Sequence, residues 1–118
     1  LAFKPDTDDI REAPSLYLIK KLLKSGAKVC AYDPEAMNNV KSVMGDTIQY
    51  ADNEYSVLDD CDALLICTEW GIFRNPDFEL MKSAMKDLVV FDGRNLFELD
   101  EMNNRGFYYS SIGRKLIN

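Results

Sequence analysis

The amino-acid sequence predicts an α/β fold, with helices on both faces of a mostly parallel sheet of about five or six strands. Apolar runs typical of strands alternate about five times with segments of helical spacing, and the connections are short. Two runs, residues 63–67 and 88–91, are continuously apolar, as expected for strands buried on both faces of a parallel sheet. The 118 residues, 47% hydrophobic and 29% charged, suit one globular domain. We therefore predict a three-layer α/β/α domain of Rossmann-like type over residues 1–118.

The clearest predicted helix follows Pro14 and ends before Gly26. Proline in the first turn and glycine just past the last turn commonly bound a helix. Apolar side chains recur between them at helical spacing, at Leu16, Ile19, Leu22 and Leu23. Further helices are predicted at residues 35–44, 54–58, 78–85 and 99–103, and strands at 28–32, 48–50, 63–67, 88–91 and 107–109. Residues 1–3 have the pattern of a strand's end, so we expect a fragment of a longer protein with its first strand truncated.

Composition argues against several classes of function. A net charge of −6 and a pI near 4.6 disfavour general nucleic-acid binding, which needs a surplus of Lys and Arg. No apolar run approaches the roughly 20 residues of a membrane helix, and we expect no signal peptide. Three cysteines without close paired spacing favour a reducing, cytoplasmic compartment. Because the chain lacks histidine, His-based acid–base catalysis and His-ligated metal sites are excluded within it, and we predict no metal site.

Three cations fall in loops that should meet at one edge of the sheet. In an open parallel sheet, ligands bind outside the carboxyl ends of the strands. The loops expected there are residues 4–12, 33–34, 68–71 and 92–95, and they carry Lys4, Arg11 and Arg94. Lysine and arginine both bind phosphate oxygens, and the loop from Lys4 leads into a helix N-terminus, which favours anions. This pattern predicts a phosphate-containing ligand. The alternative is that Lys4 and Arg11 only pair with the acidic residues of their own loop, Asp6, Asp8, Asp9 and Glu12.

The sequence does not contain a dinucleotide-binding half of its own. No GxGxxG glycine pattern follows the first strand, so NAD binding by this chain alone is disfavoured. Asp33 ends the second strand, where such a fold would hold a ribose, but an ordinary turn is the favoured interpretation. A second possibility for Asp33 is the phosphorylatable aspartate of a non-catalytic, doubly wound regulatory module. The central run 64–67 offers no such aspartate, because Thr-Glu-Trp follows it.

Trp70 and the cysteines allow more than one interpretation. Trp70 follows a predicted strand instead of lying inside it, so its ring could stack on a base or sugar, or pack across the domain edge. Cys30 and Cys67 are expected to be small buried hydrophobes. Cys61 lies between two aspartates, which disfavour a thiolate. We therefore predict no catalytic residue in this chain.

Three motifs together resemble one family. Leu-Ala-Phe-Lys-Pro-Asp-Thr-Asp-Asp-Ile-Arg-Glu-Ala-Pro-Ser at residues 1–15, Cys-Thr-Glu-Trp at 67–70 and Phe-Asp-Gly-Arg-Asn at 91–95 resemble the C-terminal domain of the UDP-glucose/GDP-mannose dehydrogenases. The resemblance spans essentially the whole chain. The second and third motifs are more like the UDP-glucose branch than the GDP-mannose or UDP-N-acetylmannosamine branches, which stay the alternatives.

The resemblance implies oxidation of UDP-glucose to UDP-glucuronate in two hydride transfers to NAD. The catalytic cysteine and main NAD site of the family lie upstream, and no cysteine here matches that nucleophile. The motif positions imply that Phe3 and Lys4 contact the UDP-sugar and that Arg94 reaches it across a domain or subunit boundary. Arg11 would approach the NAD pyrophosphate, and the possible pocket residues are Thr68, Glu69 and Trp70. Implied partners are the UDP-sugar and the remainder of the same enzyme, which would be a homodimer or larger; no nucleic-acid or membrane partner is expected.

Overall fold

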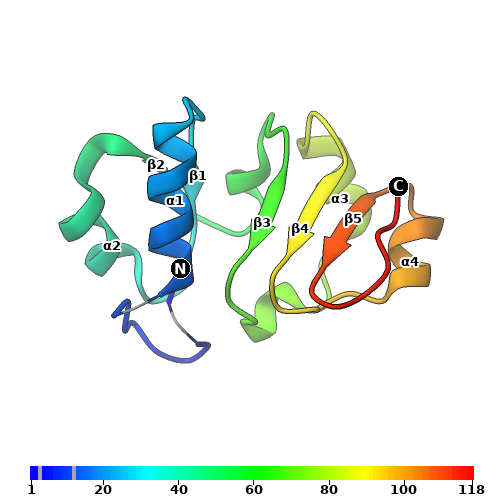
Figure 1. Cartoon of the computed structure of the whole chain (residues 1–118), viewed down its shortest axis with the longest axis horizontal. Helices are drawn as coiled ribbons and strands as arrows, with labels where there is room; N and C mark the ends of the chain where they lie inside the picture. Colours follow the sequence, from blue (N-terminus) through cyan, green and yellow to red (C-terminus); the bar gives the residue numbers. More distant parts are fainter. Residues whose placement is uncertain (3, 12) are drawn as a thin grey trace. The chain divides into compact units, whose positions relative to one another are not determined.

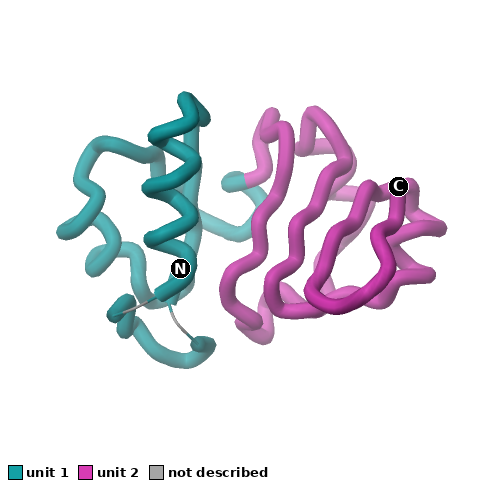
Figure 2. The backbone as a smooth tube through the Cα atoms, in the orientation of Figure 1, with its two compact units in different colours: residues 1–57 teal, residues 58–118 magenta. Residues whose placement is uncertain are grey.

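The computed structural model describes residues 1–2, 4–11 and 13–118, so the predictions for Phe3 and Glu12 lie outside the described residues. The chain divides into two compact units, residues 1–57 and residues 58–118, which Figure 2 shows in two colours. Helices and strands alternate in both (Figure 1). Every named strand pair is parallel, in one two-stranded and one three-stranded sheet among the described residues. The prediction of an α/β fold with parallel sheets is confirmed.

The first unit consists of two helices and two short strands. Its elements are α1 (Pro14–Lys24), β1 (Cys30–Ala31), α2 (Met37–Met44), the 3-10 helix η1 (Gly45–Thr47) and β2 (Gln49–Tyr50), followed by η2 (Ser56–Leu58). Helix α1 begins at Pro14 as predicted, and Gly26, with φ 91°, follows its end in a conformation that suits glycine. The core combines side chains of both helices with β1 and its flanks: Ala2, Ile19, Ala31, Ala36, Val40, Met44 and Ile48.

The second unit is built on the sheet β3–β4–β5. Its elements are β3 (Leu64–Ile66), η3 (Gly71–Phe73), α3 (Phe78–Ala84), β4 (Val89–Asp92), α4 (Leu99–Asn104) and β5 (Tyr108–Ser111). Phe78 at the start of α3 makes edge contacts with Phe97 and Phe107, and Phe97 contacts Tyr109 of β5. These aromatic rings join α3 to one face of the sheet. Beyond β5, Ile117 forms an antiparallel bridge with Tyr109.

One prediction about the strands was wrong. Residues 88–91 were expected to be buried on both faces, yet Phe91 is 43% exposed while its neighbour Val90 is 0% exposed. The register places Val90 beside Tyr109, on the face that the aromatic core covers, and alternation turns Phe91 to the opposite face. There its ring lies 6.2 Å from that of Tyr108, which is also exposed. An apolar run therefore did not indicate which faces are covered.

Other differences concern short elements. Strands β1, β2 and β3 are shorter than predicted, β4 has the predicted length but begins one residue later, and β5 continues to Ser111. The helix expected at residues 54–58 is the 3-10 helix η2. The 3-10 helices η1 and η3 were not predicted. In the described part of the chain, no helix is both long and apolar enough to cross a membrane.

Candidate functional site

The loop that follows β4 is fixed by a buried carboxylate. Asp92, the last residue of β4, is 1% exposed. Its Oδ1 accepts a hydrogen bond from the backbone N–H of Arg94 (2.9 Å), and its Oδ2 accepts one from Leu96 (2.7 Å). The N–H of Gly93 donates to the carbonyl of Ile66 in β3, and a Cβ at position 93 would lie 3.1 Å from that oxygen. The backbone that carries Arg94 is thus tied to two parallel strands at their carboxyl ends.

The Arg94 side chain lies across the segment that follows β3. Its Nε donates to the carbonyl of Cys67 (2.9 Å) and lies 3.6 Å from Oε2 of Glu69. Both charged side chains are partly shielded, at 29% exposure for Arg94 and 25% for Glu69. Shielding strengthens charge interactions because less water screens them. The structure therefore brings together two of the predicted site motifs, residues 67–70 and 91–95.

The neighbours of Glu69 form the buried base of this segment. Thr68 is 1% exposed and Trp70 is 7% exposed. Such burial favours packing over stacking as the role of the Trp70 ring. Burial is also the largest cause of a raised pKa of the Cys67 thiol, against an opposing contribution from the Arg94 charge. A thiol that resists ionisation is a poor nucleophile.

The prediction that Cys30 is buried was wrong. Cys30 is exposed, whereas the next residue, Ala31, is buried in the core of the first unit. Strand β1 has only two residues, and successive strand side chains point to opposite faces. Only one of the two can therefore face the core. A hollow of about 510 Å³ borders Cys30 and the end of β2, lined by Cys30, Gln49, Tyr50, Ala51, Asp52 and Ser56. Its lining residues include no cation that would favour a phosphate.

The cations of the first unit are in a different environment. Lys4 is exposed, and the Arg11 side chain is 88% exposed. Arg11 donates from Nη2 to Oδ2 of Asp9 at 2.7 Å and from Nε to both Asp9 oxygens at 3.1 Å. This pair lowers the pKa of Asp9, chiefly through the side-chain hydrogen bond. Arg11 therefore pairs with an acidic residue of its own loop, and its contact with a ligand stays a prediction. Because solvent screens such exposed pairs, Arg11 can still exchange partners.

Asp33 is a structural anchor. It is 1% exposed, and its Oδ1 accepts hydrogen bonds from the backbone N–H groups of Glu35 (2.9 Å) and Ala36 (2.8 Å). Its Oδ2 accepts from Ala2 N–H (3.0 Å) and from the Leu1 ammonium (2.7 Å). A carboxylate so occupied and buried is poorly placed for a ribose hydroxyl or for phosphorylation. The favoured interpretation, a turn, agrees with this geometry.

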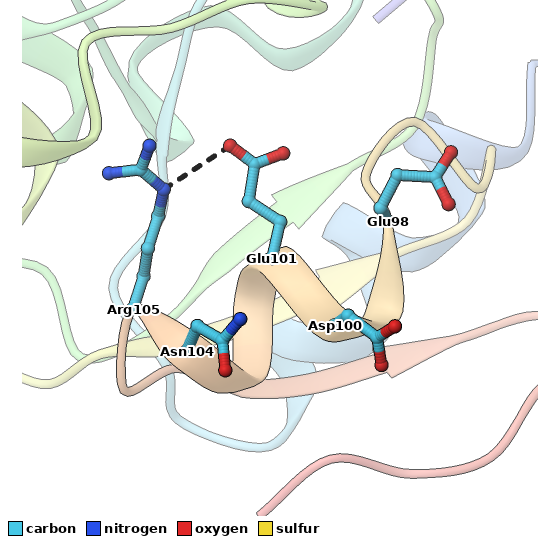
Figure 3. Close-up of a pocket in the computed structure, with 5 residues that line it drawn as sticks. All are labelled: Glu98, Asp100, Glu101, Asn104 and Arg105. Atoms are coloured by element: carbon cyan, nitrogen blue, oxygen red, sulfur yellow. Dashed lines mark hydrogen bonds and ion pairs between the residues drawn. The ribbon is translucent and has the colours of Figure 1, made fainter.

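A surface hollow on α4 has the wrong charge for a phosphate. Figure 3 shows its lining side chains, which are Glu98, Asp100, Glu101, Asn104 and Arg105. Its volume is about 550 Å³. Nε of Arg105 is engaged by Glu101 at 3.2 Å, so carboxylates dominate the lining. We do not assign ligand binding to this hollow.

Sequence analysis missed two side chains that support the Arg94 loop. The Tyr109 hydroxyl donates to Oδ2 of Asp92 (2.6 Å), and Nη2 of Arg114 donates to that hydroxyl oxygen (2.8 Å). Burial, followed by the hydrogen bond to Asp92, raises the pKa of Tyr109 to about 12. The first contact joins residues 17 apart in the sequence, and Arg114 reaches Asp92 only through the Tyr109 hydroxyl. The sequence shows a tyrosine at the end of a predicted strand, Tyr109, and a single arginine after it, Arg114. Neither residue by itself indicates its hydrogen-bond partner.

Fold and site together define an α/β domain with a braced arginine at the carboxyl ends of parallel strands, the place where this class binds nucleotides. The sequence model of the UDP-glucose/GDP-mannose dehydrogenase family, UDP binding domain, matches residues 1–99. The chain belongs to the UDP-glucose/GDP-mannose dehydrogenase family.

Individual relatives agree with this assignment. UDP-glucose 6-dehydrogenase TuaD of Bacillus subtilis is 42% identical over 117 residues, which cover 99% of this chain and 25% of that protein. A solved UDP-glucose dehydrogenase from Pyrobaculum islandicum aligns with a TM-score of 0.73 at 35% identity, over 86% of this chain and 22% of that one. A solved NDP-N-acetyl-D-galactosaminuronic acid dehydrogenase from Methanosarcina mazei aligns with a TM-score of 0.72 at 27% identity, over 96% and 23%. The chain spans about a quarter of the length of the curated relatives it matches.

Proposed function

We propose that this chain is the nucleotide-binding domain of an NAD-dependent UDP-glucose 6-dehydrogenase, which oxidises UDP-glucose to UDP-glucuronate in two hydride transfers. The observation that carries the proposal is Arg94, which a buried carboxylate holds at the carboxyl ends of two parallel strands. Its support is the match to a UDP binding domain and the names of relatives that cover nearly the whole chain. The full-length protein acts as a cytoplasmic homodimer or larger assembly, and this chain alone is inactive.

In this proposal the chain binds and orients the UDP-sugar. Arg94 offers a planar guanidinium fork, which matches the spacing of phosphate or carboxylate oxygens. Glu69 orients that fork from 3.6 Å away. Thr68 and Trp70, both buried, set the shape of the pocket wall. Lys4, an exposed residue, and Phe3 contribute further contacts to the sugar nucleotide.

NAD is the hydride acceptor, and the chain does not fit it as a self-contained site. The glycine fingerprint that lets a backbone approach a pyrophosphate is missing from the sequence. We therefore place the main NAD site in another part of the longer protein. Arg11 approaches the NAD pyrophosphate from this chain, exchanging its exposed Asp9 partner for phosphate oxygens.

The first test is titration of the 118-residue chain with UDP and UDP-glucuronate. Calorimetric heat and the fluorescence of Trp70, the single tryptophan, are the readouts. We expect saturable binding of both ligands. Absence of binding at millimolar ligand would show that the isolated chain cannot hold UDP.

The second test uses the full-length protein. Lys4→Ala and Arg94→Ala should each lower kcat/KM for UDP-glucose, whereas Lys86→Ala, which removes an exposed lysine charge, should not. Unchanged kcat/KM in both site variants would contradict the site assignment. Faster turnover of GDP-mannose or UDP-N-acetylmannosamine than of UDP-glucose would overturn the proposed substrate instead.

A further inference from the structure

The Arg94 loop, residues 92–96, is held by residues 109–114, a segment that begins in the last strand of the sheet and continues beyond it. Tyr109 in β5 is 0% exposed, and its hydroxyl donates to Asp92 Oδ2 at 2.6 Å. Arg114 donates from Nη2 to that hydroxyl oxygen (2.8 Å) and from Nη1 to the carbonyl of Phe97 (3.0 Å). Its Nε donates to Oγ of Ser111 (2.9 Å). Segment 109–114 therefore contacts the Arg94 loop at Asp92, its first residue, and contacts Phe97, the residue after its last.

A second set of contacts holds the loop on the other side of Arg94. The Asn95 side-chain amide donates to the carbonyl of Ile112 (3.0 Å), and its oxygen accepts from the Ile112 N–H (2.8 Å). Asn95 has φ 55°, a left-handed conformation that asparagine tolerates better than most residues. Arg94 is thus flanked in sequence by two residues, Asp92 and Asn95, that are each hydrogen-bonded to segment 109–114.

We propose that segment 109–114 is a positioning element for Arg94, with Tyr109 and Arg114 acting through Asp92 and the Ile112 backbone acting through Asn95. The inference rests on the proposed function, since it assumes that Arg94 binds the nucleotide sugar. Segment 109–114 lies beyond residue 99, where the match to the family's sequence model ends. Its side chains are assigned no contact with substrate; they are positioning residues.

The physical reason is preorganisation. A binding group that is already ordered loses less conformational freedom when the ligand arrives, so affinity rises without new contacts. Asp92 can order the loop only while its oxygens keep their donors. The Tyr109 hydroxyl is such a donor at neutral pH, since an ordinary tyrosine ionises only near 10 and burial raises the pKa of Tyr109 further, to about 12. Without it, the carboxylate would lose one of its donors, and it would hold the backbone N–H groups of Arg94 and Leu96 less firmly.

Two variants of the full-length protein test the positioning element. Tyr109→Phe keeps the ring and removes the hydroxyl, and Asn95→Gly keeps a residue that accepts positive φ while removing both bonds to Ile112. Each should raise KM for UDP-glucose roughly fivefold to tenfold, because small misplacements of binding groups are costly. The matched control is Tyr108→Phe, a neighbouring tyrosine on the exposed face, which should leave KM unchanged. Circular dichroism at the assay temperature should show that all three variants are folded.

A double-variant comparison separates positioning through Arg94 from general loosening of the structure. In the Arg94→Ala background, adding Tyr109→Phe or Asn95→Gly should raise KM no further, because the group they position is already gone. A full additional loss in that background, or unchanged KM in both single variants while Arg94→Ala raises it, would overturn the inference alone. If Arg94→Ala itself leaves KM unchanged, the assumed role of Arg94 fails, and the inference fails with it.

Discussion

Asp33 and Asp92 have the same local task in the two units, yet only one of them supports a candidate site. Both are 1% exposed, both lie at or just after the carboxyl end of a strand, and both accept backbone N–H groups of the following turn. The turn after Asp33 leads into α2 and carries no cation. The turn after Asp92 carries Arg94, and Asp92 also accepts the Tyr109 hydroxyl. A buried aspartate at a strand end therefore indicates an anchored loop, and function depends on what that loop carries.

The largest expected effect is a loss of stability, and it should be similar for the two anchoring aspartates, Asp33 and Asp92. Asp92→Ala should lower the free energy of unfolding by roughly 3 kcal/mol or more, because it strands several buried donors at once. Asp33→Ala should cost a similar amount in its own unit. Asp87→Ala, at an exposed aspartate, is the control and should change little. Urea denaturation followed by circular dichroism measures all three. A small cost at either anchor would break the structural parallel.

The next effect separates the two anchors by function. Asp92→Asn retains the side-chain shape but replaces one accepting oxygen with a donor, so the Arg94 loop should loosen. KM of the full-length protein for UDP-glucose should rise roughly tenfold, equivalent to about 1.4 kcal/mol. Asp33→Asn should raise KM less, because its turn displays no ligand-binding cation and it holds the Lys4 segment only through the backbone of residues 1 and 2. Equal increases in KM would contradict the distinction drawn between the two anchors.

Local sequence patterns predicted the elements whose causes are local. Pro14 and Gly26 bound α1 as expected, since proline and glycine act through their own backbone preferences. Continuous apolar runs located β3 and β4 but did not indicate which face of each strand is buried, because the residues that pack against a strand come from elsewhere in the chain. Phe91 shows the consequence: its side chain is apolar, as in a core, but it lies on the exposed face of the sheet. Cys30 failed for a related reason, since alternation in a two-residue strand turned it outward.

The candidate site divides in the same way. Arg94, Glu69 and their motifs could be recognised because they lie in short contiguous patterns. Their mutual contact could be anticipated from the rule that parallel strands end at one sheet edge. The contribution of Tyr109 and Arg114 could not be anticipated. Tyr109 donates to Asp92 across 17 residues of sequence, and Arg114 reaches Asp92 only through the Tyr109 hydroxyl. Such contacts leave no periodic signal in one sequence.

A smaller effect should appear in acid and should involve the first anchor. Burial by itself raises the pKa of Asp33, but hydrogen bonds from the Leu1 ammonium and Ala2 outweigh it and hold the pKa below its usual range. A depressed folded-state pKa contributes stability above the unfolded value of roughly 4, and that stability is lost as pH falls further. Asp33→Asn should therefore flatten the loss of stability of the 118-residue chain below about pH 4. Asp9→Asn, whose partner Arg11 is exposed, should flatten it less.

The smallest effect should appear in alkali and should involve the second anchor. Burial and the bond to Asp92 raise the pKa of Tyr109 to about 12, whereas an unfolded tyrosine ionises near 10. The folded state therefore keeps this proton longer, so its contribution to stability is complete below about pH 10 and is lost as pH rises toward 12. Tyr109→Phe should remove that part of the alkaline loss, and Tyr108→Phe should not.

Near-ultraviolet titration of the 118-residue chain measures the same ionisation directly. Burial also raises the pKa of Tyr32 and Tyr50, so the Tyr109 signal must be taken as the difference between the chain and its Tyr109→Phe variant. That difference should titrate near 12. A difference that titrates near 10 would mean that the Tyr109 hydroxyl is not held by Asp92 in solution. The second anchor would then differ from the first only in the loop it carries, and segment 109–114 would hold that loop only through Asn95 and through the bond from Arg114 to the Phe97 carbonyl.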